Sequence, residues 1–288
     1  MKKLIDVIKE AREKKVAIGH FNISNLEGLW AIFRAAKDLS VPIIIGVSEG
    51  ERDFVGIPQV RALVTTFQEQ FDFPIYLNAD HTYSFERVKE VVDAGFDAVI
   101  FDGSALPLEE NIRITKQCVE YAKSKNPDIL VEGELGVIGQ SSKMLDELPD
   151  NLAITEETIT SVEEAKHFVQ ETGIDLFSGA VGNIHGMLKN QSNPRLHIER
   201  IKELNEVLGV PLVLHGGSGI SDEDFSQAIK AGISIIHINT ELRLAYQRGL
   251  KQSLQENPEE IAPYKILKEA VLGMKQVTEK RLRLFNNM

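Results

Sequence analysis

The chain has 288 residues, and 43% of them are hydrophobic, which is enough apolar material for a full core. Its net charge of −11 and isoelectric point of about 5.2 exclude nucleic acid and anionic membrane as expected partners, because like charges repel. A negative net charge still allows a local cluster of basic residues to bind a small anion such as phosphate.

The first predicted element is an N-terminal helix. The segment MKKLIDVIKEAREKK places charged residues throughout its apolar positions, which is typical of an amphipathic helix and not of a signal peptide. No apolar run approaches membrane-spanning length. The single cysteine, Cys118, excludes an intramolecular disulfide and fits a reducing compartment. We therefore expect a cytoplasmic protein.

Eight short apolar runs follow, and each precedes a segment with helical periodicity. The runs are almost continuously apolar, as in parallel strands covered by helices. We predict strands at residues 16–22, 41–48, 74–80, 97–103, 128–135, 175–182, 211–217 and 233–239. This alternation predicts an α/β protein, a (β/α)8 TIM barrel formed by residues 1–288 as a single domain with extra N- and C-terminal helices. A doubly wound open sheet is the alternative, but no GxGxxG motif follows the first strand.

Local signals refine this picture. Ser24, Ser161 and Ser221 each precede an acidic residue by three positions, a pattern that predicts helix starts. The long irregular stretch at about 137–155, after the fifth strand, is predicted to be a mobile functional loop. From Tyr264 onward the pattern predicts a long amphipathic helix, packed on the barrel or on a second subunit.

Polar side chains gather where the predicted strands end, which is the catalytic edge of such barrels. Asp80 and His81 follow the third strand, and Asp102 follows the fourth. Burying several imidazoles and carboxylates together is costly unless a metal compensates, and three neutral imidazoles with an open position form the ligand set of a catalytic zinc. The histidines on or just after a strand are His20, His81, His185, His215 and His237, whereas the helical His167 and His197 have the pattern of surface residues.

Two of these histidines are followed by glycine-rich turns, in AVGNIHG (180–186) and LHGGSGI (214–220). Consecutive backbone N–H groups in such turns bind anions, and the loops after the seventh and eighth strands are the usual phosphate site of these barrels. A metal and a phosphate at one barrel mouth indicate a small phosphorylated carbonyl substrate. Chemistry beside a ketone needs a Schiff-base lysine or a Lewis-acid metal. The predicted strands contain no lysine, which favours the metal.

The sequence resembles the class II, zinc-dependent ketose-bisphosphate aldolases, the family of fructose- and tagatose-bisphosphate aldolases, over essentially the whole chain. The motifs that carry this resemblance, in order, are FNISNLEG (21–28), NADHTYSFE (78–86), FDGSALPLEENI (101–112), VEGELGVIG (131–139), AVGNIHG (180–186) and LHGGSGI (214–220).

The resemblance implies that His81, His185 and His215 bind zinc, although other divalent metals also suit a site with three histidines. It implies that Asp80 is the acid/base that exchanges a proton with the C4 oxygen of the substrate. It also places Asp102 and Glu134 beside the metal, as an alternative metal site to which Glu134 contributes.

The same resemblance assigns the phosphate loop to Gly186, Gly216 and Ser218, with a monovalent cation, Na⁺ or K⁺, close by. Thr240 matches a phosphate-contacting threonine after the eighth strand. The family also implies a homodimer or homotetramer that assembles through outer helices. For the second phosphate of the substrate, Arg52 and Arg243 are the candidates.

The chain departs from the family pattern after the fifth strand. Ser141 and Ser142 stand where the family carries an acid that moves the proton on the enediolate carbon. Asp146 or Glu147, further along the same loop, is the expected replacement.

A second departure follows the eighth strand. His237 stands where the family usually has an asparagine that contacts the substrate near its carbonyl, and Asn239 stands where an acid or alanine is common. Most relatives have a small residue at the position of His20. We expect His20 to pair with His237 along one wall of the pocket.

The expected activity is reversible aldol cleavage of fructose 1,6-bisphosphate to dihydroxyacetone phosphate and glyceraldehyde 3-phosphate. Cleavage of tagatose bisphosphate or another ketose phosphate is one alternative, because it differs only in the aldehyde or in one hydroxyl. A metal-dependent phosphosugar isomerase or epimerase and a non-catalytic barrel are further alternatives.

Overall fold

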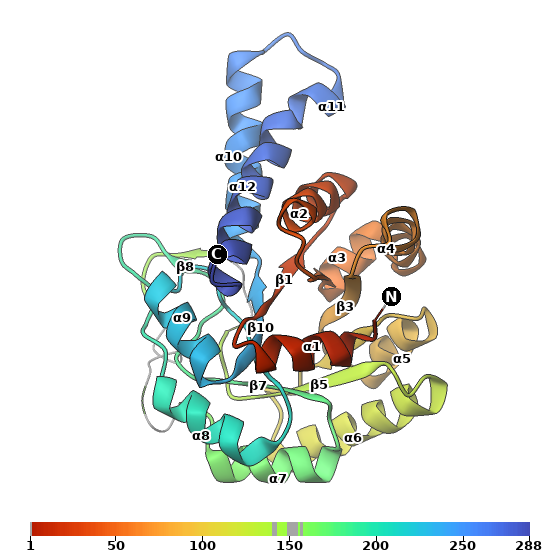
Figure 1. Cartoon of the computed structure of the whole chain (residues 1–288), viewed down its shortest axis with the longest axis vertical. Helices are drawn as coiled ribbons and strands as arrows, with labels where there is room; N and C mark the ends of the chain where they lie inside the picture. The colour runs from red at the N-terminus through yellow and green to blue at the C-terminus, as the bar shows by residue number, and fades with distance from the viewer. Residues whose placement is uncertain (1, 140–142, 149–154, 156–157) are drawn as a thin grey trace.

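The computed structural model describes residues 2–139, 143–148, 155 and 158–288. Eight parallel strands form a closed barrel with helices around it, which confirms the predicted (β/α)8 architecture (Figure 1). Seven of the strands lie inside the predicted ranges, and β3 continues two residues further, to Thr82. The barrel strands are β1 (Ile18–Asn22), β2 (Ile43–Val47), β3 (Ile75–Thr82), β4 (Ala98–Phe101), β5 (Leu130–Leu135), β7 (Leu176–Gly179), β9 (Leu212–Leu214) and β10 (Ile233–Ile238).

The helices begin largely where the sequence predicts. The hydroxyl groups of Ser161 and Ser221 accept hydrogen bonds from the third backbone N–H after them, whereas Asn25, and not Ser24, caps the helix that follows β1. The helices are α1 (Leu4–Glu13), α2 (Leu26–Leu39), α3 (Glu49–Val55), α4 (Ile57–Phe71), α5 (Phe85–Asp93), α6 (Leu108–Lys125), α7 (Val162–Thr172), α8 (Ile198–Leu208), α9 (Asp222–Ala231), α10 (Thr240–Glu256), α11 (Pro263–Ile266) and α12 (Lys268–Phe285).

The barrel interior is built in layers, because side chains two residues apart on a strand share a face. The lowest layer takes one buried side chain from each strand, and the apolar face of α1 covers it from below. The members of this layer are Ile18, Ile44, Tyr76, Ala98, Leu130, Leu176, Val213 and Ile235. Two residues further along each strand, the next layer is mostly polar and includes His20, Asn78, Glu132, Ser178, His215 and His237. The apolar layer thus forms the floor, and the polar layer lies between it and the open end.

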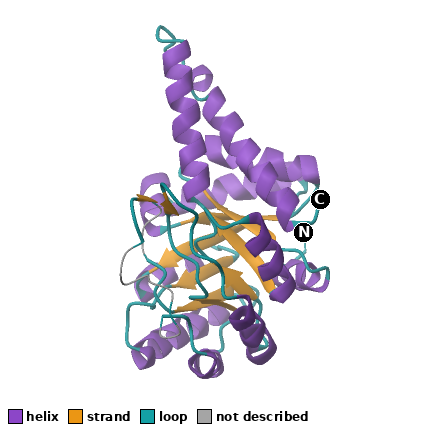
Figure 2. Ribbon diagram, turned by 90° about the vertical axis from the view of Figure 1, so that its left-hand side faces the viewer, coloured by secondary structure: helices purple, strands orange, loops and turns teal. Residues whose placement is uncertain are grey.

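The predicted C-terminal helix is present as α11 and α12. Its final turns pack on the barrel, where the backbone carbonyl of Phe285 accepts a hydrogen bond from the N–H of Ala17. Further out, α10 and α12 run side by side and project from the barrel as an arm (Figures 1 and 2). Across the described residues, no helix is long and apolar enough to cross a bilayer.

The loop predicted at about 137–155 contains a short strand that the sequence did not indicate. This strand, β6 (Met144–Leu145), pairs in parallel with β8 (Met187–Leu188) and so joins the segment after β5 to the segment that carries His185. Residues 140–142 and 149–154, including Ser141 and Ser142, lie outside the described residues.

Candidate metal and anion site

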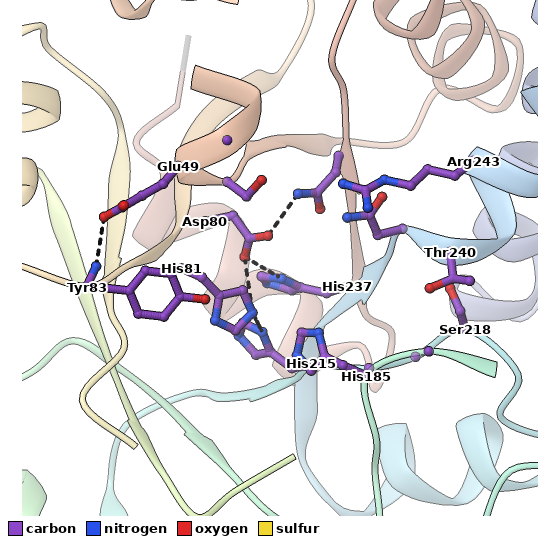
Figure 3. A pocket seen from close by; sticks show the side chains of 17 residues that line it. Glu49, Asp80, His81, Tyr83, His185, His215, Ser218, His237, Thr240 and Arg243 are labelled. Carbon is purple, nitrogen blue, oxygen red and sulfur yellow. Dashed lines mark hydrogen bonds and ion pairs between the residues drawn. The ribbon is translucent and has the colours of Figure 1, made fainter. Parts of the chain in front are cut away.

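A cavity of about 230 Å³ opens at the C-terminal ends of the strands (Figure 3). This is the edge at which barrel enzymes carry their chemistry. Its lining includes the predicted site residues Asp80, His81, His185, Gly186, His215, Gly216, Ser218, His237, Asn239 and Thr240, together with Arg243. The structure thus brings together side chains from β3, β10 and the loops after β7 and β9.

Three imidazoles converge in this cavity. Nε2 of His81 lies 3.1 Å from Nδ1 of His215, and a nitrogen of His185 lies within 4.8 Å of both rings. Within the described part of the chain, the buried Nε2 atom of His185 has no hydrogen-bond partner. A divalent cation would give all three nitrogens a partner, so the set fits a metal site with three histidine ligands.

Carboxylates behind two of the rings fix their orientation. Nδ1 of His81 lies 2.8 Å from Oδ2 of Asp102, and Nε2 of His215 lies 2.8 Å from Oε1 of Glu132. An ionised carboxylate only accepts hydrogen bonds, so each of these ring nitrogens carries the proton and the opposite nitrogen directs a lone pair to the centre. Sequence reasoning did not assign Glu132 to the site. The signal that could have found it is its position two residues after Leu130, which faces the barrel interior.

Glu134 lies behind His81 as well. Its Oε2 atom is 3.6 Å from Nδ1 of His81 and has no hydrogen-bond partner among the described residues. Burial, reinforced by the neighbouring Asp102, raises the pKa of Glu134 to about 7. His81, Asp102 and Glu134 offer ligand atoms within 4.8 Å of one another, so they form a second group that could hold a metal, at the predicted alternative position.

Asp80 and His81 both line the cavity although they are adjacent on β3. Neighbouring residues of a regular strand face opposite sides. Here the register between β3 and β4 shifts between Ala79 and Thr82, and His81 has a φ of +32°. This irregularity is a bulge-like distortion that turns both side chains toward the opening, and such distortions concentrate at functional sites.

Asp80 is only 4% exposed, and its carboxylate has polar neighbours on two sides. Nδ2 of Asn22 donates a hydrogen bond of 2.8 Å to Oδ2. Nδ1 of His237 lies 3.3 Å from Oδ1 (Figure 3). Burial opposes ionisation of this carboxyl, but His81 and His237 outweigh that effect and hold its pKa well below the usual range. Asp80 is therefore a carboxylate in this environment.

The prediction that Arg52 contacts a phosphate is wrong. Arg52 is fully buried, and its guanidinium donates to the backbone carbonyls of Val47 and Asp80 and to the hydroxyl of Thr82. It therefore connects the ends of β2 and β3 and is not available in the cavity. Arg243, by contrast, lines the cavity and is half exposed.

The glycine-rich turns form one wall of the cavity. At Gly216, φ is +61° and a Cβ atom would lie 2.3 Å from the carbonyl oxygen of Ile184, so no side chain fits there. Asn193 donates hydrogen bonds to the carbonyls of Gly186 and Ser218 and so joins the two turns, a role that the sequence did not indicate. Thr240 begins α10 beside Ser218, which directs a helix N-terminus toward the same wall.

The two predicted loop acids lie away from this cluster. The side chain of Asp146 is 82% exposed and forms an ion pair of 2.7 Å with Lys189. Among the described residues that line the cavity, neither Asp146 nor Glu147 is present.

Comparisons with known proteins agree over the whole chain. A family profile described as "Fructose-bisphosphate aldolase class-II" matches residues 2–288. A fructose-bisphosphate aldolase of Geobacillus stearothermophilus is 35% identical over 285 residues, which cover 98% of this chain and 96% of the relative. Among solved structures, the YdjI aldolase of Escherichia coli K12 has a TM-score of 0.82 and 31% identity, covering 98% of this chain and 96% of its own. A putative fructose-1,6-biphosphate aldolase of Coccidioides immitis has a TM-score of 0.84 and 28% identity, covering 99% of this chain and 96% of its own.

Proposed function

The chain belongs to the class-II fructose-bisphosphate aldolase family, a family of lyases, and on this premise we propose that it reversibly cleaves fructose 1,6-bisphosphate to dihydroxyacetone phosphate and glyceraldehyde 3-phosphate. One observation carries the proposal: three converging imidazoles, a buried carboxylate and two glycine-rich turns line one cavity. Metal, acid/base and phosphate functions would therefore meet around a single small substrate.

We propose that His81, His185 and His215 hold a zinc ion, with Asp102 and Glu132 fixing two of the rings. Cobalt, manganese or iron would also suit these ligands. When bound, the ion supplies positive charge beside the substrate carbonyl and stabilises the negative charge that cleavage leaves, a contribution of several kcal/mol.

Asp80 is the proposed acid/base at the aldehyde end. During cleavage its carboxylate accepts the proton of the C4 hydroxyl, the C3–C4 bond breaks, and the electron pair of that bond passes to C3 and the adjoining carbonyl. In the condensation direction Asp80 returns the proton to the C4 oxygen. For the proton delivered to C3, Asp146 or Glu147 remains the proposed donor, which requires this loop to fold toward the cavity.

Gly186, Gly216 and Ser218 are the proposed ligands of the phosphate on C1, and Thr240 at the start of α10 completes them. Their support is the close backbone approach at Gly216 together with the helix N-terminus beside Ser218. A monovalent cation, Na⁺ or K⁺, near these turns belongs to the same proposal.

Arg243 is the proposed ligand of the second phosphate. We expect Arg243→Ala to raise KM for fructose 1,6-bisphosphate by about 10- to 100-fold, which corresponds to the loss of one charge-assisted hydrogen bond. KM for fructose 1-phosphate should change little, because that substrate lacks the group that Arg243 binds. Steady-state kinetics with both substrates check this, and Arg248→Ala, on the exposed side of the same helix, is the matched control. Equal losses for both substrates would exclude the assignment.

A coupled assay for triose phosphate tests the proposed reaction. We expect the protein to form triose phosphate from fructose 1,6-bisphosphate, to lose this activity with a chelator and to regain it with zinc. Faster cleavage of tagatose 1,6-bisphosphate would reassign the substrate. Conversion of the sugar without triose phosphate would indicate an isomerase or epimerase and refute the proposal.

The proposal also includes the cellular setting. Cys118 is the single cysteine and is buried, so the chain forms no intramolecular disulfide, which suits a protein of the reducing cytoplasm. A homodimer or homotetramer would use outer helices, and the arm of α10, α11 and α12 presents the exposed apolar side chains of Leu254, Ile261, Tyr264 and Leu272.

A further inference from the structure

Two buried histidines that the family pattern does not predict lie against Asp80. His20 on β1 and His237 on β10 are register partners, and their rings stack with centroids 3.4 Å apart and planes within 6° of parallel. Both side chains are buried, but His237 lines the cavity whereas His20 lies behind it. The stack is therefore a wall of two rings, of which only that of His237 reaches the cavity.

His20 is fixed on its far side. Nδ2 of Asn78 donates a hydrogen bond of 3.0 Å to Nε2 of His20. The ring also fills the space beside Gly46, where a Cβ atom would lie 2.1 Å from Cε1 of His20. A residue with a side chain at position 46 could not coexist with this ring. Contacts with β2 and β3 thus hold His20 of β1 in one orientation. Because the two rings stack, the orientation of His20 also restricts that of His237.

His237 and Asn22 face different oxygens of the Asp80 carboxylate. The Nδ1 atom of His237 lies 3.3 Å from Oδ1 of Asp80, while Asn22 donates to Oδ2. Neither Nδ1 of His237 nor Oδ1 of Asp80 has a hydrogen-bond partner of good geometry among the described residues, and a carboxylate oxygen accepts, so the ring can serve Asp80 only with the proton on Nδ1.

We propose that His237, supported by His20, is a positioning residue that fixes the Asp80 carboxylate at Oδ1, while Asn22 holds Oδ2, and so orients it toward the C4 oxygen. This role differs from that of the family asparagine at the same position, which contacts the substrate near its carbonyl. The inference rests on the proposed aldol cleavage, because Asp80 is the acid/base only in that reaction.

The two half-reactions of an aldolase separate these roles. Cleavage of fructose 1,6-bisphosphate needs Asp80, whereas proton exchange at C3 of dihydroxyacetone phosphate forms the enediolate without it. A residue that acts through Asp80 should slow cleavage alone. A residue that contacts the carbonyl region should slow both.

We expect His237→Phe, which keeps an aromatic ring against His20 but cannot donate, to lower kcat for cleavage by about 10- to 100-fold, the scale of a misplaced catalytic group. Exchange at C3 should stay near the wild-type rate. His237→Asn restores a donor and should recover part of kcat, while His20→Ala, which removes only the support, should fall between the wild type and His237→Phe.

Metal content and melting temperature are measured for every variant, because the ring of His237 also lies 4.0 Å from that of His215. Parallel loss of cleavage and exchange, or no loss of either, would overturn the positioning role. A variant that loses its metal would do the same, because His237 would then act on the metal site. If the wild type itself neither cleaves nor exchanges, the failure lies in the proposed function and not in this inference.

Discussion

The Asp80→Asn variant is expected to lose about 10²- to 10⁴-fold in kcat for cleavage of fructose 1,6-bisphosphate, the usual contribution of a positioned acid/base. The amide has nearly the shape of the carboxylate but cannot accept the proton of the C4 hydroxyl. KM should change little, because the phosphate-binding turns are untouched. The kinetics of cleavage, measured with the triose phosphate assay, check this result.

The control for Asp80→Asn is proton exchange at C3 of dihydroxyacetone phosphate, which should continue at a rate close to that of the wild type. Bound metal should also be unchanged, because Asp80 is not one of the three converging ligands. Cleavage within tenfold of the wild-type rate would show that another group moves the proton. Loss of exchange together with cleavage would place Asp80 in the enediolate step instead.

The His185→Ala variant is expected to lose stoichiometric zinc and about a thousandfold or more in kcat/KM, because metal stabilisation of the developing charge contributes several kcal/mol. His185 is the most informative ligand to remove, since its Nε2 atom has no hydrogen-bond partner among the described residues and so has no evident second role. Metal content by mass spectrometry and the triose phosphate assay check both parts of the prediction.

Two further variants calibrate this result. Glu132→Gln keeps the ligand His215 but weakens the partner that orients it, and should lower zinc affinity by about 10- to 100-fold. His167→Ala removes an exposed histidine of α7 and should change neither metal content nor activity. If His185→Ala retained zinc and activity, the assignment of the three ligands would be wrong.

The strands and the position of the site could be predicted because both depend on local pattern. Continuous apolar runs indicate buried parallel strands, and the C-terminal ends of those strands must meet at one edge. For the same reason the strand-end histidines were expected to meet, and the resemblance to the aldolase family singled out His81, His185 and His215 among them. A pair of His20 and His237 along one wall of the pocket was also expected, because β1 and β10 are neighbours in a closed barrel. The two rings do pair, but only His237 lines the cavity.

Other features depend on contacts between segments far apart in the sequence. The irregularity at His81 has no residue signature, since a positive φ is uncommon for any residue with a side chain. Arg52 has the pattern of an exposed helical arginine, but carbonyls from two strands surround its guanidinium. The β6–β8 pair and the hydrogen bonds of Asn193 likewise join separate loops, and a segment of two residues is too short to carry a periodicity that would predict such a contact.

The central claim is that three imidazoles from separate elements of the barrel share one divalent cation. Anomalous diffraction at the zinc absorption edge, from crystals of the wild-type protein, tests it most directly. We predict one strong peak about 2.0–2.1 Å from Nε2 of His81, Nε2 of His185 and Nδ1 of His215. A zinc-containing crystal with no peak at this position, or with its peak elsewhere, would contradict the account.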